Sequence, residues 1–395
     1  PAAARVAASP LDARATRYAL GAFSLSGLLA AMVGAMLPAW GHHFRTEFVT
    51  VGHYFVSMMA GVAISVVVTP ILLRRKGVPF VLILSCAMAF VSIVFLAFSA
   101  PPEDATRRMA GLAGAGFSMG LLNGGICQVV SAACRHDFAT TASMAGGVFG
   151  LGCLLVTLLV GGLLETYSPT VILLVAAIMP AIFFVLFARP RFPHVEVPPP
   201  PPIREMLADF RSPRALLLAA LLFFQFGNEW SIAGWLPIFL IHRLGLSPAA
   251  ALSILSLYWA ALLAGRMGAL AILPRFSHVK MLAASAAAAA FGCIILLSTN
   301  NQFGAVTGVL MAGLGYSTIF PLTAERIGHR FKYYHPGIFS GIFSFAMVGA
   351  MLAPAMGGYL TEWMGFGFTM AIPLIGTVMV FLLSAAIWLE VRINE

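Results

Sequence analysis

The chain has 395 residues, of which 60% are hydrophobic and only 9% are charged. Its mean hydropathy of +0.95 excludes a soluble globular protein, because such a chain cannot present a water-compatible surface. The formal net charge of +9 would suit a nucleic-acid-binding protein, but the distribution of the basic residues argues against that class.

Apolar stretches of about 20 residues, the length that crosses the hydrocarbon core of a bilayer, recur along the whole chain. They cover residues 17–40, 49–73, 79–99, 109–133, 140–164 and 169–188 in the first half, and 213–241, 248–273, 279–299, 303–324, 337–361 and 366–390 in the second. The sequence therefore predicts an all-α membrane protein with twelve transmembrane helices.

Short strings in the second half repeat strings in the first. The string Gly114–Ser118 (GAGFS) returns as Gly313–Ser317 (GLGYS), and Leu37-Pro38 returns as Leu236-Pro237. Both repeats have the same displacement, since 313 − 114 and 237 − 38 both equal 199. A same-sense repeat of membrane-spanning segments is typical of transporters whose two halves rock around a shared site near the membrane midplane.

The longest polar connection, residues 189–212, separates the two repeats and contains the run Pro198–Pro202. Five consecutive prolines favour a stiff polyproline II spacer. We therefore predict an N-terminal six-helix bundle, residues 1–188, a cytoplasmic linker, and a C-terminal six-helix bundle, residues 213–395.

The basic residues are concentrated on one side of the predicted membrane. If the N-terminus is cytoplasmic, the other side holds only Arg45, Arg107, Arg108 and Arg243, Arg266 lies inside a predicted helix, and the remaining 18 of 23 are cytoplasmic. This bias follows the positive-inside rule. We expect a multi-pass protein of the inner (plasma) membrane with both termini cytoplasmic, and no nucleic-acid partner.

The sequence offers no catalytic or metal-binding pattern. No histidine has partners at zinc spacing, and the five cysteines show no C-x-x-C spacing. The H-E-x-x-H, G-x-S-x-G and P-loop patterns are absent. The glycine-rich run Gly111–Gly120 lies inside an apolar segment with no preceding strand, so it is not a dinucleotide loop. We expect neither an enzyme nor a metal or cofactor site.

Of the 14 acidic residues, Glu229 is the one well inside a predicted helix. An ionised, unpartnered carboxylate at that depth costs about 3 kcal/mol, so Glu229 is neutral, paired, or facing a wet cavity. Gln225, Asn228 and Glu229 share one helix face. We predict Glu229 as the proton-coupling residue; the alternative is a hydrogen-bonded clamp that only packs helices together.

Several other amides and aromatic side chains also fall inside predicted helices. Amides hydrogen-bond to sugar hydroxyls, and the apolar face of a sugar ring stacks on Trp or Tyr. Core packing is the alternative for each aromatic residue taken alone. The predicted substrate-binding residues are Asn123, Gln128, Gln225, Asn228, Trp235, Tyr258 and Tyr316.

Arg266 lies near the inner end of the eighth predicted helix. Its guanidinium needs acceptors there, because its charge is not removed by titration. We expect Arg266 to be a gating residue that pairs with helix-end carbonyls or a carboxylate, ties this helix to a neighbouring inner element and stabilises the outward-open state.

Twelve predicted helices in two halves resemble the major facilitator superfamily, and several strings resemble its branch of fucose, galactose and glucose proton symporters. In that fucose symporter an Asp occupies the position of Gly34, so the resemblance does not carry over its proton-coupling residue. The loop between the second and third helices keeps only the basic end, Arg74-Arg75-Lys76, of a superfamily motif. The strings that carry the resemblance are Phe149-Gly150-Leu151-Gly152, Gly227-Asn228-Glu229, Gly234-Trp235-Leu236-Pro237, Tyr258-Trp259, Gly265-Arg266, Gly313-Leu314-Gly315, Phe320-Pro321, Pro354 and Gly357-Gly358.

The sequence thus predicts a monomeric secondary active transporter in the lipid bilayer. We expect alternating access and proton-coupled uptake of a monosaccharide or similar small polar solute. Two alternatives stay open: an exporter of amphipathic drugs or organic anions, and a solute sensor of the same fold that transports nothing.

Overall fold

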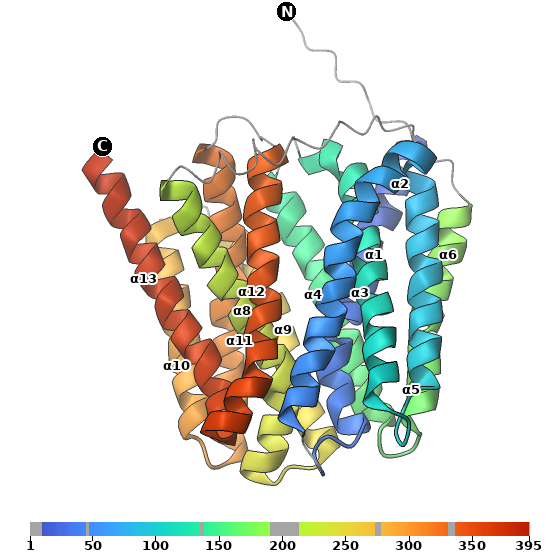
Figure 1. Ribbon diagram of the computed structural model, residues 1–395. Coiled ribbons are helices and arrows are strands. Elements are labelled where there is room, and N and C mark those ends of the chain that lie inside the picture. The colour runs from blue at the N-terminus through green and yellow to red at the C-terminus, as the bar shows by residue number, and fades with distance from the viewer. Residues whose placement is uncertain are drawn as a thin grey trace, which may run out of the picture.

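The computed structural model describes residues 10–44, 47–134, 138–189, 213–272, 278–330 and 336–394. These residues form long helices that cross the molecule side by side (Figure 1). The helices are α1 (Pro10–Ala39), α2 (Phe48–Ala97), α3 (Ala105–Cys134), α4 (Phe138–Leu163), α5 (Pro169–Ala176), α6 (Ile178–Ala188), α8 (Pro213–Leu244), α9 (Pro248–Ile272), α10 (His278–Ser298), α11 (Gln302–Arg330), α12 (Pro336–Met364), the 3-10 helix η2 (Phe366–Met370) and α13 (Ala371–Asn394).

Apolar composition and helix form are linked, because a backbone in lipid must satisfy its hydrogen bonds within its own segment. Within the described residues, ten helices are long and apolar enough to cross a membrane. The difference from the twelve predicted stretches arises largely at α2, which has 50 residues and non-helical dihedrals at Gly77 (φ 82°, ψ 171°). Figure 1 shows α2 as a hairpin whose two arms each cross the molecule. All twelve predicted stretches correspond to helical passes.

Two predicted helices have interruptions that the sequence did not indicate. The sixth stretch is divided into α5 and α6 at Ala177, and the twelfth begins with η2 before α13. The hydroxyl of Ser168 accepts a hydrogen bond from the Val171 amide, which caps α5 at its start. The predicted linker lies outside the described residues from residue 190 onward.

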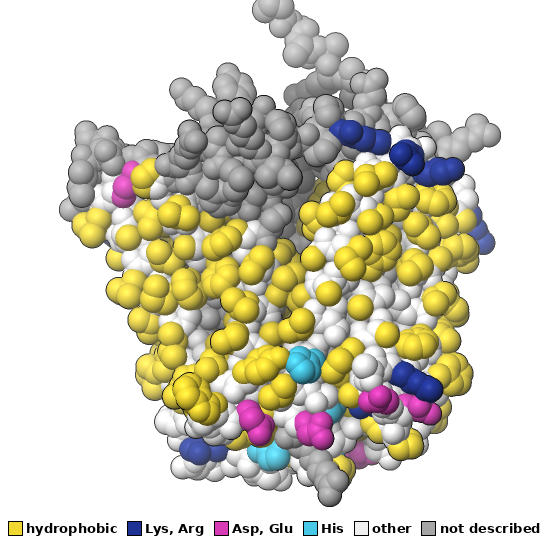
Figure 2. Space-filling view, in the orientation of Figure 1, with side chains coloured by type: hydrophobic (Ala, Val, Ile, Leu, Met, Phe, Trp, Pro, Cys, Tyr) yellow, Lys and Arg dark blue, Asp and Glu magenta, His cyan; other side chains and the backbone are white. Residues whose placement is uncertain are grey.

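The surface of the molecule matches a lipid environment. Figure 2 shows hydrophobic side chains over the middle band and charged side chains near the two edges. At one edge, the exposed residues Arg74, Arg75 and Lys76 form the tip of the α2 hairpin. The first turn of α1 and the last turn of α13 lie at this edge in Figure 1, and we call this edge the termini side.

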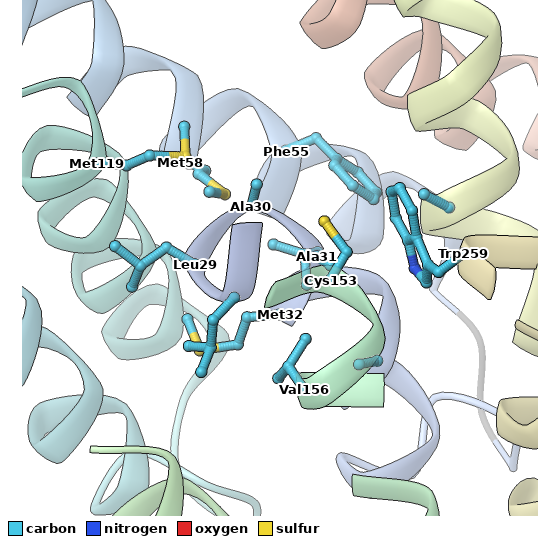
Figure 3. Packing of buried hydrophobic residues seen from close by; sticks show 14 of the residues in the cluster. Leu29, Ala30, Ala31, Met32, Phe55, Met58, Met119, Cys153, Val156 and Trp259 are labelled. Atoms are coloured by element: carbon cyan, nitrogen blue, oxygen red, sulfur yellow. The ribbon is translucent and has the colours of Figure 1, made fainter. Parts of the chain in front are cut away.

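Residues 10–189 form one group of helices, with an apolar core between α1, α2, α3 and α4. Leu29 and Met32 of α1, Met58 of α2 and Met119 of α3 are all buried in it. Figure 3 shows Met58 and Met119 side by side, with Leu29 and Met32 of α1 in the same cluster. Methionine fills the irregular space between close helices because its side chain is unbranched and flexible.

The first and second halves of the chain pack together through α4 and α9, and also on the side opposite the termini. There α1 packs against α8 and α2 against α12. A Cβ added at Gly34 of α1 would lie 2.1 Å from the carbonyl oxygen of Ala233 in α8, so this approach requires glycine. In Figure 1, α2 and α12 converge on this side and diverge toward the termini side.

A hydrogen bond also joins the two halves on the side opposite the termini. His53 Nε2 of α2 and the Tyr359 hydroxyl of α12 are 2.7 Å apart. In the same contact, the backbones of Gly52 and Gly358 approach closely. The molecule is therefore closed on this side.

The structure corrects the interpretation of Arg108 as a loop cation. Arg108 lies in the first turn of α3 and is only 6% exposed. Its Nε donates to the Tyr54 hydroxyl (2.7 Å), and its Nη1 donates to the carbonyls of Ser99 (3.3 Å) and Glu103 (2.8 Å). The guanidinium also lies 6.0 Å from the centre of the Trp40 ring. Its neighbour Arg107 is exposed, as predicted, and pairs with Glu103.

Candidate functional site

Glu229 lies in α8 and is 6% exposed. Gln225, one turn earlier on the same helix face, donates a hydrogen bond from Nε2 to Glu229 Oε1 (2.8 Å). The same nitrogen lies 3.3 Å from the backbone carbonyl oxygen of Tyr316 in α11. Of the three residues predicted to share one face, Gln225 and Glu229 meet, and Gln225 connects the carboxylate to α11.

Arg266 of α9 supplies the charge partner of Glu229. Its Nη2 is 3.5 Å from Glu229 Oε2, and both side chains are buried. Its Nη1 donates to the backbone carbonyl of Gly146 in α4, at 2.9 Å. Arg266 therefore connects α8 with α4, which belong to different halves of the chain. The sequence analysis expected helix-end carbonyls or a carboxylate as partners of Arg266. The partners found are the Glu229 carboxylate and the carbonyl of Gly146, which lies within α4 rather than at a helix end.

Several polar atoms around this ion pair are buried without a hydrogen-bond partner among the described residues. They are Gln225 Oε1, Arg266 Nε, the Tyr258 hydroxyl and Trp259 Nε1. Such atoms usually have a partner, since a lost hydrogen bond in a buried place costs about 1–3 kcal/mol. The site thus has unused capacity for hydrogen bonding, mostly as donor.

An aromatic group flanks the ion pair. Trp230, next to Glu229, is partly exposed. Its ring centre lies 6.1 Å from Phe149 of α4, edge to face, and 5.9 Å from Trp259 of α9. The sequence-predicted aromatic residues did not include Trp230. Its position beside a buried carboxylate was the signal available in the sequence.

Asn228 and Tyr316 belong to a second polar group, between α8, α11 and α13. Asn228 Nδ2 donates to Thr377 Oγ1 (3.3 Å), which lies 2.6 Å from the Tyr316 hydroxyl. Cys293 Sγ of α10 is 3.3 Å from the same hydroxyl. This group fixes α8 against α13.

Trp235 does not lie with the Glu229 group. It is fully buried, and its Nε1 donates to the carbonyl of Pro354 in α12 at 2.9 Å. Its ring is 6.4 Å from both Phe48 and Phe55 of α2. In this conformation Trp235 is part of the contact that closes the side opposite the termini.

Asn123 and Gln128 lie on α3, in the other half of the chain, and are partly buried. Asn123 Oδ1 has no hydrogen-bond partner among the described residues. Of the predicted site residues, Glu229 directly contacts both Gln225 and Arg266. Within the described residues, no group of three or more His, Cys, Asp or Glu side chains has the arrangement of a metal site.

Comparison with known proteins identifies the fold. A family model described as Major Facilitator Superfamily matches residues 19–347. The chain belongs to the major facilitator superfamily. It is 22% identical over 349 residues to an uncharacterized MFS-type transporter of Yersinia pestis, covering 86% of this chain and 87% of that protein.

Two solved structures of this superfamily have the same fold. The E. coli fucose:proton symporter FucP has a TM-score of 0.66 and 15% identity, covering 94% of this chain and 98% of that one. The E. coli xylose transporter XylE, in a partially occluded inward open conformation, has a TM-score of 0.73 and 14% identity, covering 95% and 98%. The chain is therefore a multi-pass membrane protein of a transporter family.

Proposed function

We propose that this protein is a secondary active transporter that takes up a small polar solute, of monosaccharide size, together with protons. The observation that carries the proposal is the buried ion pair between Glu229 and Arg266, because Arg266 also bonds to the other half of the chain. Alternating access then occurs between the proposed bundles, residues 1–188 and 213–395.

Glu229 is our proposed proton carrier. It is the only buried carboxylate among the residues whose exposure the structure describes. Burial penalises the charged form, whereas Arg266 and the amide of Gln225 favour it. A carboxylate held between such opposing effects changes its protonation when its surroundings change. Opening the site alternately to the two sides of the membrane provides that change.

Matching contacts in the two halves support the proposed duplication. Gly27 of α1 faces Phe149 and Cys153 of α4, and Gly227 of α8 faces Gly349 and Ala353 of α12. Each of these positions in the second half lies 200 residues after its counterpart, as in 227 − 27 and 349 − 149. The same local packing is thus built twice.

Contacts between the halves follow the same rule. Gly52 of α2 faces Gly358 of α12, and Leu252 of α9 faces Gly161 of α4. Replacing each residue by its counterpart in the other half converts the first pair into the second. Gly52 corresponds to Leu252, 200 residues later, and Gly161 corresponds to Gly358, 197 residues later. This is the pattern of two bundles related by a two-fold axis along the membrane normal.

The contacts also indicate the conformation. If both termini are cytoplasmic, the closed side faces outward, and α2 and α12 diverge toward the cytoplasm (Figure 1). Arg266 bonds to Gly146 across the two halves in this state. The sequence analysis expected Arg266 to stabilise the outward-open state; we propose instead that this bond forms when the outer side is closed and changes as the halves rock.

The chemistry of the side chains supports the solute class. Trp230 offers a partly exposed ring face, and Tyr258, Gln225 and Asn123 offer hydrogen-bonding atoms that have no described partner. Rings and amides together suit a hydroxylated solute. The solved structures that share the fold are named as fucose and xylose transporters, which agrees with this class.

Replacing Glu229 by Gln tests the proposal, because Gln keeps the shape and most hydrogen bonds but does not titrate. We expect accumulation against a gradient, driven by an imposed pH difference in proteoliposomes, to disappear, while energy-independent counterflow persists. The exposed Glu165→Gln variant, in the loop after α4, is the matched control and retains both activities.

Other outcomes contradict parts of the proposal. Accumulation by Glu229→Gln equal to that of the wild type removes Glu229 as the carrier. Wild-type counterflow without any accumulation makes the protein a facilitator. Solute binding without counterflow makes it a sensor.

A further inference from the structure

Charge balance at the Glu229 site restricts the chemistry of the solute. Among the residues whose exposure the structure describes, three charged side chains are buried: Arg108, Glu229 and Arg266. Arg108 lies in the first half, near the helix ends far from the termini. Its Nε donates to Tyr54, and its Nη1 donates to two backbone carbonyls. The site therefore holds one positive and one negative charge, and its net charge is zero.

The ion pair makes incomplete use of the guanidinium. The closest approach to Glu229 is a single contact of 3.5 Å, beyond the usual 2.7–2.9 Å of charge-assisted hydrogen bonds. Arg266 Nε is buried with no partner among the described residues. Guanidinium groups bind carboxylates best through two parallel N–H bonds, and Glu229 does not provide that geometry here.

Besides Arg266 Nε, two other buried groups on α9 have no hydrogen-bond partner among the described residues, and both can donate. Trp259 Nε1 only donates, and the Tyr258 hydroxyl both donates and accepts. Trp259 and Arg266 are seven residues apart on α9 and share one helix face. A ligand with several acceptor oxygens, and a negative charge for Arg266, would satisfy this face.

We propose that the transported solute carries a carboxylate, and that this carboxylate binds Arg266 in place of Glu229 once Glu229 is protonated. The solute class is a small hydroxylated monocarboxylic acid, such as a sugar acid. This inference rests on the proposed function, since it assumes transport through the Glu229 site.

The exchange balances in protons and charge. A proton from the outer side converts the Glu229 carboxylate into a neutral acid, which releases Arg266. The solute enters as a carboxylate anion and pairs with Arg266. On the inner side Glu229 gives its proton to water, recovers Arg266 and displaces the solute.

Few other groups act on Glu229. Arg266 and the Tyr258 phenol of α9 and the Cys153 thiol of α4 interact with it electrostatically. From α11, Tyr316 presents its carbonyl to the neighbouring Gln225. The described residues of α1, α12, α13 and η2 bring no charged side chain to Glu229. One proton therefore governs whether Arg266 is available.

The cycle that follows is electroneutral. The empty site holds Glu229 and Arg266 as ions, and the loaded site holds a neutral Glu229, Arg266 and the solute anion. Both have zero net charge, so the membrane potential does no work on either. A neutral sugar carried with one proton would instead add one positive charge to the loaded site.

The first test measures what drives uptake in proteoliposomes. We use glucuronate, galacturonate and gluconate as probes, with glucose, galactose and fucose as their neutral counterparts. We expect an imposed pH difference to drive accumulation of an acid, and a potassium-diffusion potential at equal pH to drive none. Acid uptake that responds to the potential as strongly as to the pH difference overturns the exchange.

The panel separates this inference from the proposed function. Transport of neutral sugars without acids overturns the inference and leaves proton-coupled transport intact. Counterflow with no probe overturns both. The methyl ester of glucuronate, which keeps the ring and hydroxyls but has no charge, is the matched control and is expected to compete poorly with glucuronate.

The second test uses Glu229→Gln, which imitates the protonated site. In the wild type, the affinity for the transported acid falls as pH rises, because ionised Glu229 recaptures Arg266, approaching tenfold per pH unit. In Glu229→Gln the affinity is expected to be independent of pH. An equal pH dependence in both proteins overturns the competition between Glu229 and the solute.

Discussion

The two halves of the molecule carry opposite kinds of side chain at matching positions. Counting back 200 residues from Gln225, Asn228 and Glu229 of α8 gives Leu25, Leu28 and Leu29 of α1. All three leucines are buried in the apolar core of the first half.

The same substitution holds for the helices around them. Gly116 faces Met58, as Gly313 faces Tyr258, so Met58 corresponds to Tyr258 and Met119 to Tyr316. Figure 3 shows Leu29, Met58 and Met119 in a single apolar cluster. The place that holds a charged site in the second half is filled with aliphatic side chains in the first.

Near the helix ends far from the termini the arrangement is reversed: the buried charge lies in the first half, and apolar residues occupy the matching positions of the second. There the first half buries Arg108 against Tyr54, and the corresponding residues of the second half are Ala305 and Ile254, both buried. One scaffold has thus been used twice with different chemistry. We infer that the second half performs the proton chemistry and most of the solute binding, while the first half provides a packed wall and the buried polar group around Arg108 and Tyr54.

Removing the cation of the second half gives the largest expected effect. Arg266→Ala leaves Glu229 buried without its charge partner, so we expect a loss of about 3–5 kcal/mol in the free energy of unfolding, measured by denaturation in detergent. The double variant Arg266→Met with Glu229→Gln removes both charges and is expected to recover most of this loss. Equal stability of the single and double variants would show that the pair is not coupled.

Removing the buried cation of the first half should cost less and act differently. Arg108→Ala breaks hydrogen bonds to Tyr54, Ser99 and Glu103, and we expect a loss of about 2–3 kcal/mol in stability. The ratio of protons to solute moved should stay the same. A changed ratio, measured with a pH electrode and labelled solute, would place coupling chemistry in the first half as well.

The buried polar group of the first half, in which His42 and Arg108 both contact the Tyr54 hydroxyl, also predicts that stability depends on pH. Burial, together with the nearby Arg108 charge, lowers the pKa of His42 from 6.5 to about 4. Since this pKa is lower in the folded state, stability is full above pH 6.5 and falls as pH drops toward 4. We expect a loss of about 2 kcal/mol between pH 7.5 and pH 5, from the cost of 1.36 kcal/mol per pKa unit. In His42→Gln this part of the loss should be absent.

The smallest expected effect comes from giving the second half a residue of the first. Asn228→Leu, which copies Leu28, removes the hydrogen bond to Thr377 at a cost of about 1 kcal/mol in stability. Transport should continue with an affinity within about threefold of the wild type, corresponding to less than 1 kcal/mol. A much larger loss of affinity with unchanged stability would make Asn228 a solute ligand.

Much of the fold could be predicted from the sequence, because apolar length alone determines a crossing in lipid. The twelve passes follow from that rule. The repeat was less accurate in detail: the strings at Gly114 and Gly313 match at 199 residues, yet Gly114 faces Ser92 of α2 and Gly313 faces Tyr258 of α9. The contacts make Gly116, not Gly114, the counterpart of Gly313, which is a displacement of 197 residues. The two glycines of the first string face different helix neighbours, so matching letters alone did not identify the structural counterpart.

The site was predictable only in part. The rarity of a carboxylate within an apolar helix indicated Glu229, and the shared helix face indicated Gln225. Spacing along one helix does not show which residues of other helices approach it, so the contact of Arg266 with Glu229 required the structure. For the same reason the burial of Trp235 in a contact between the halves, and of Arg108 among backbone carbonyls, was not foreseen.

The protonation of Glu229 on solute binding is the central claim, and infrared difference spectroscopy of membranes with and without the transported solute measures it directly. We predict that solute addition produces the carbonyl band of a protonated carboxylic acid in the wild type, and that this band is absent in Glu229→Gln. Carbon-13 labelling of the solute carboxylate separates its bands from those of the protein. A wild-type spectrum without the band, or a band that persists in Glu229→Gln, would contradict the account.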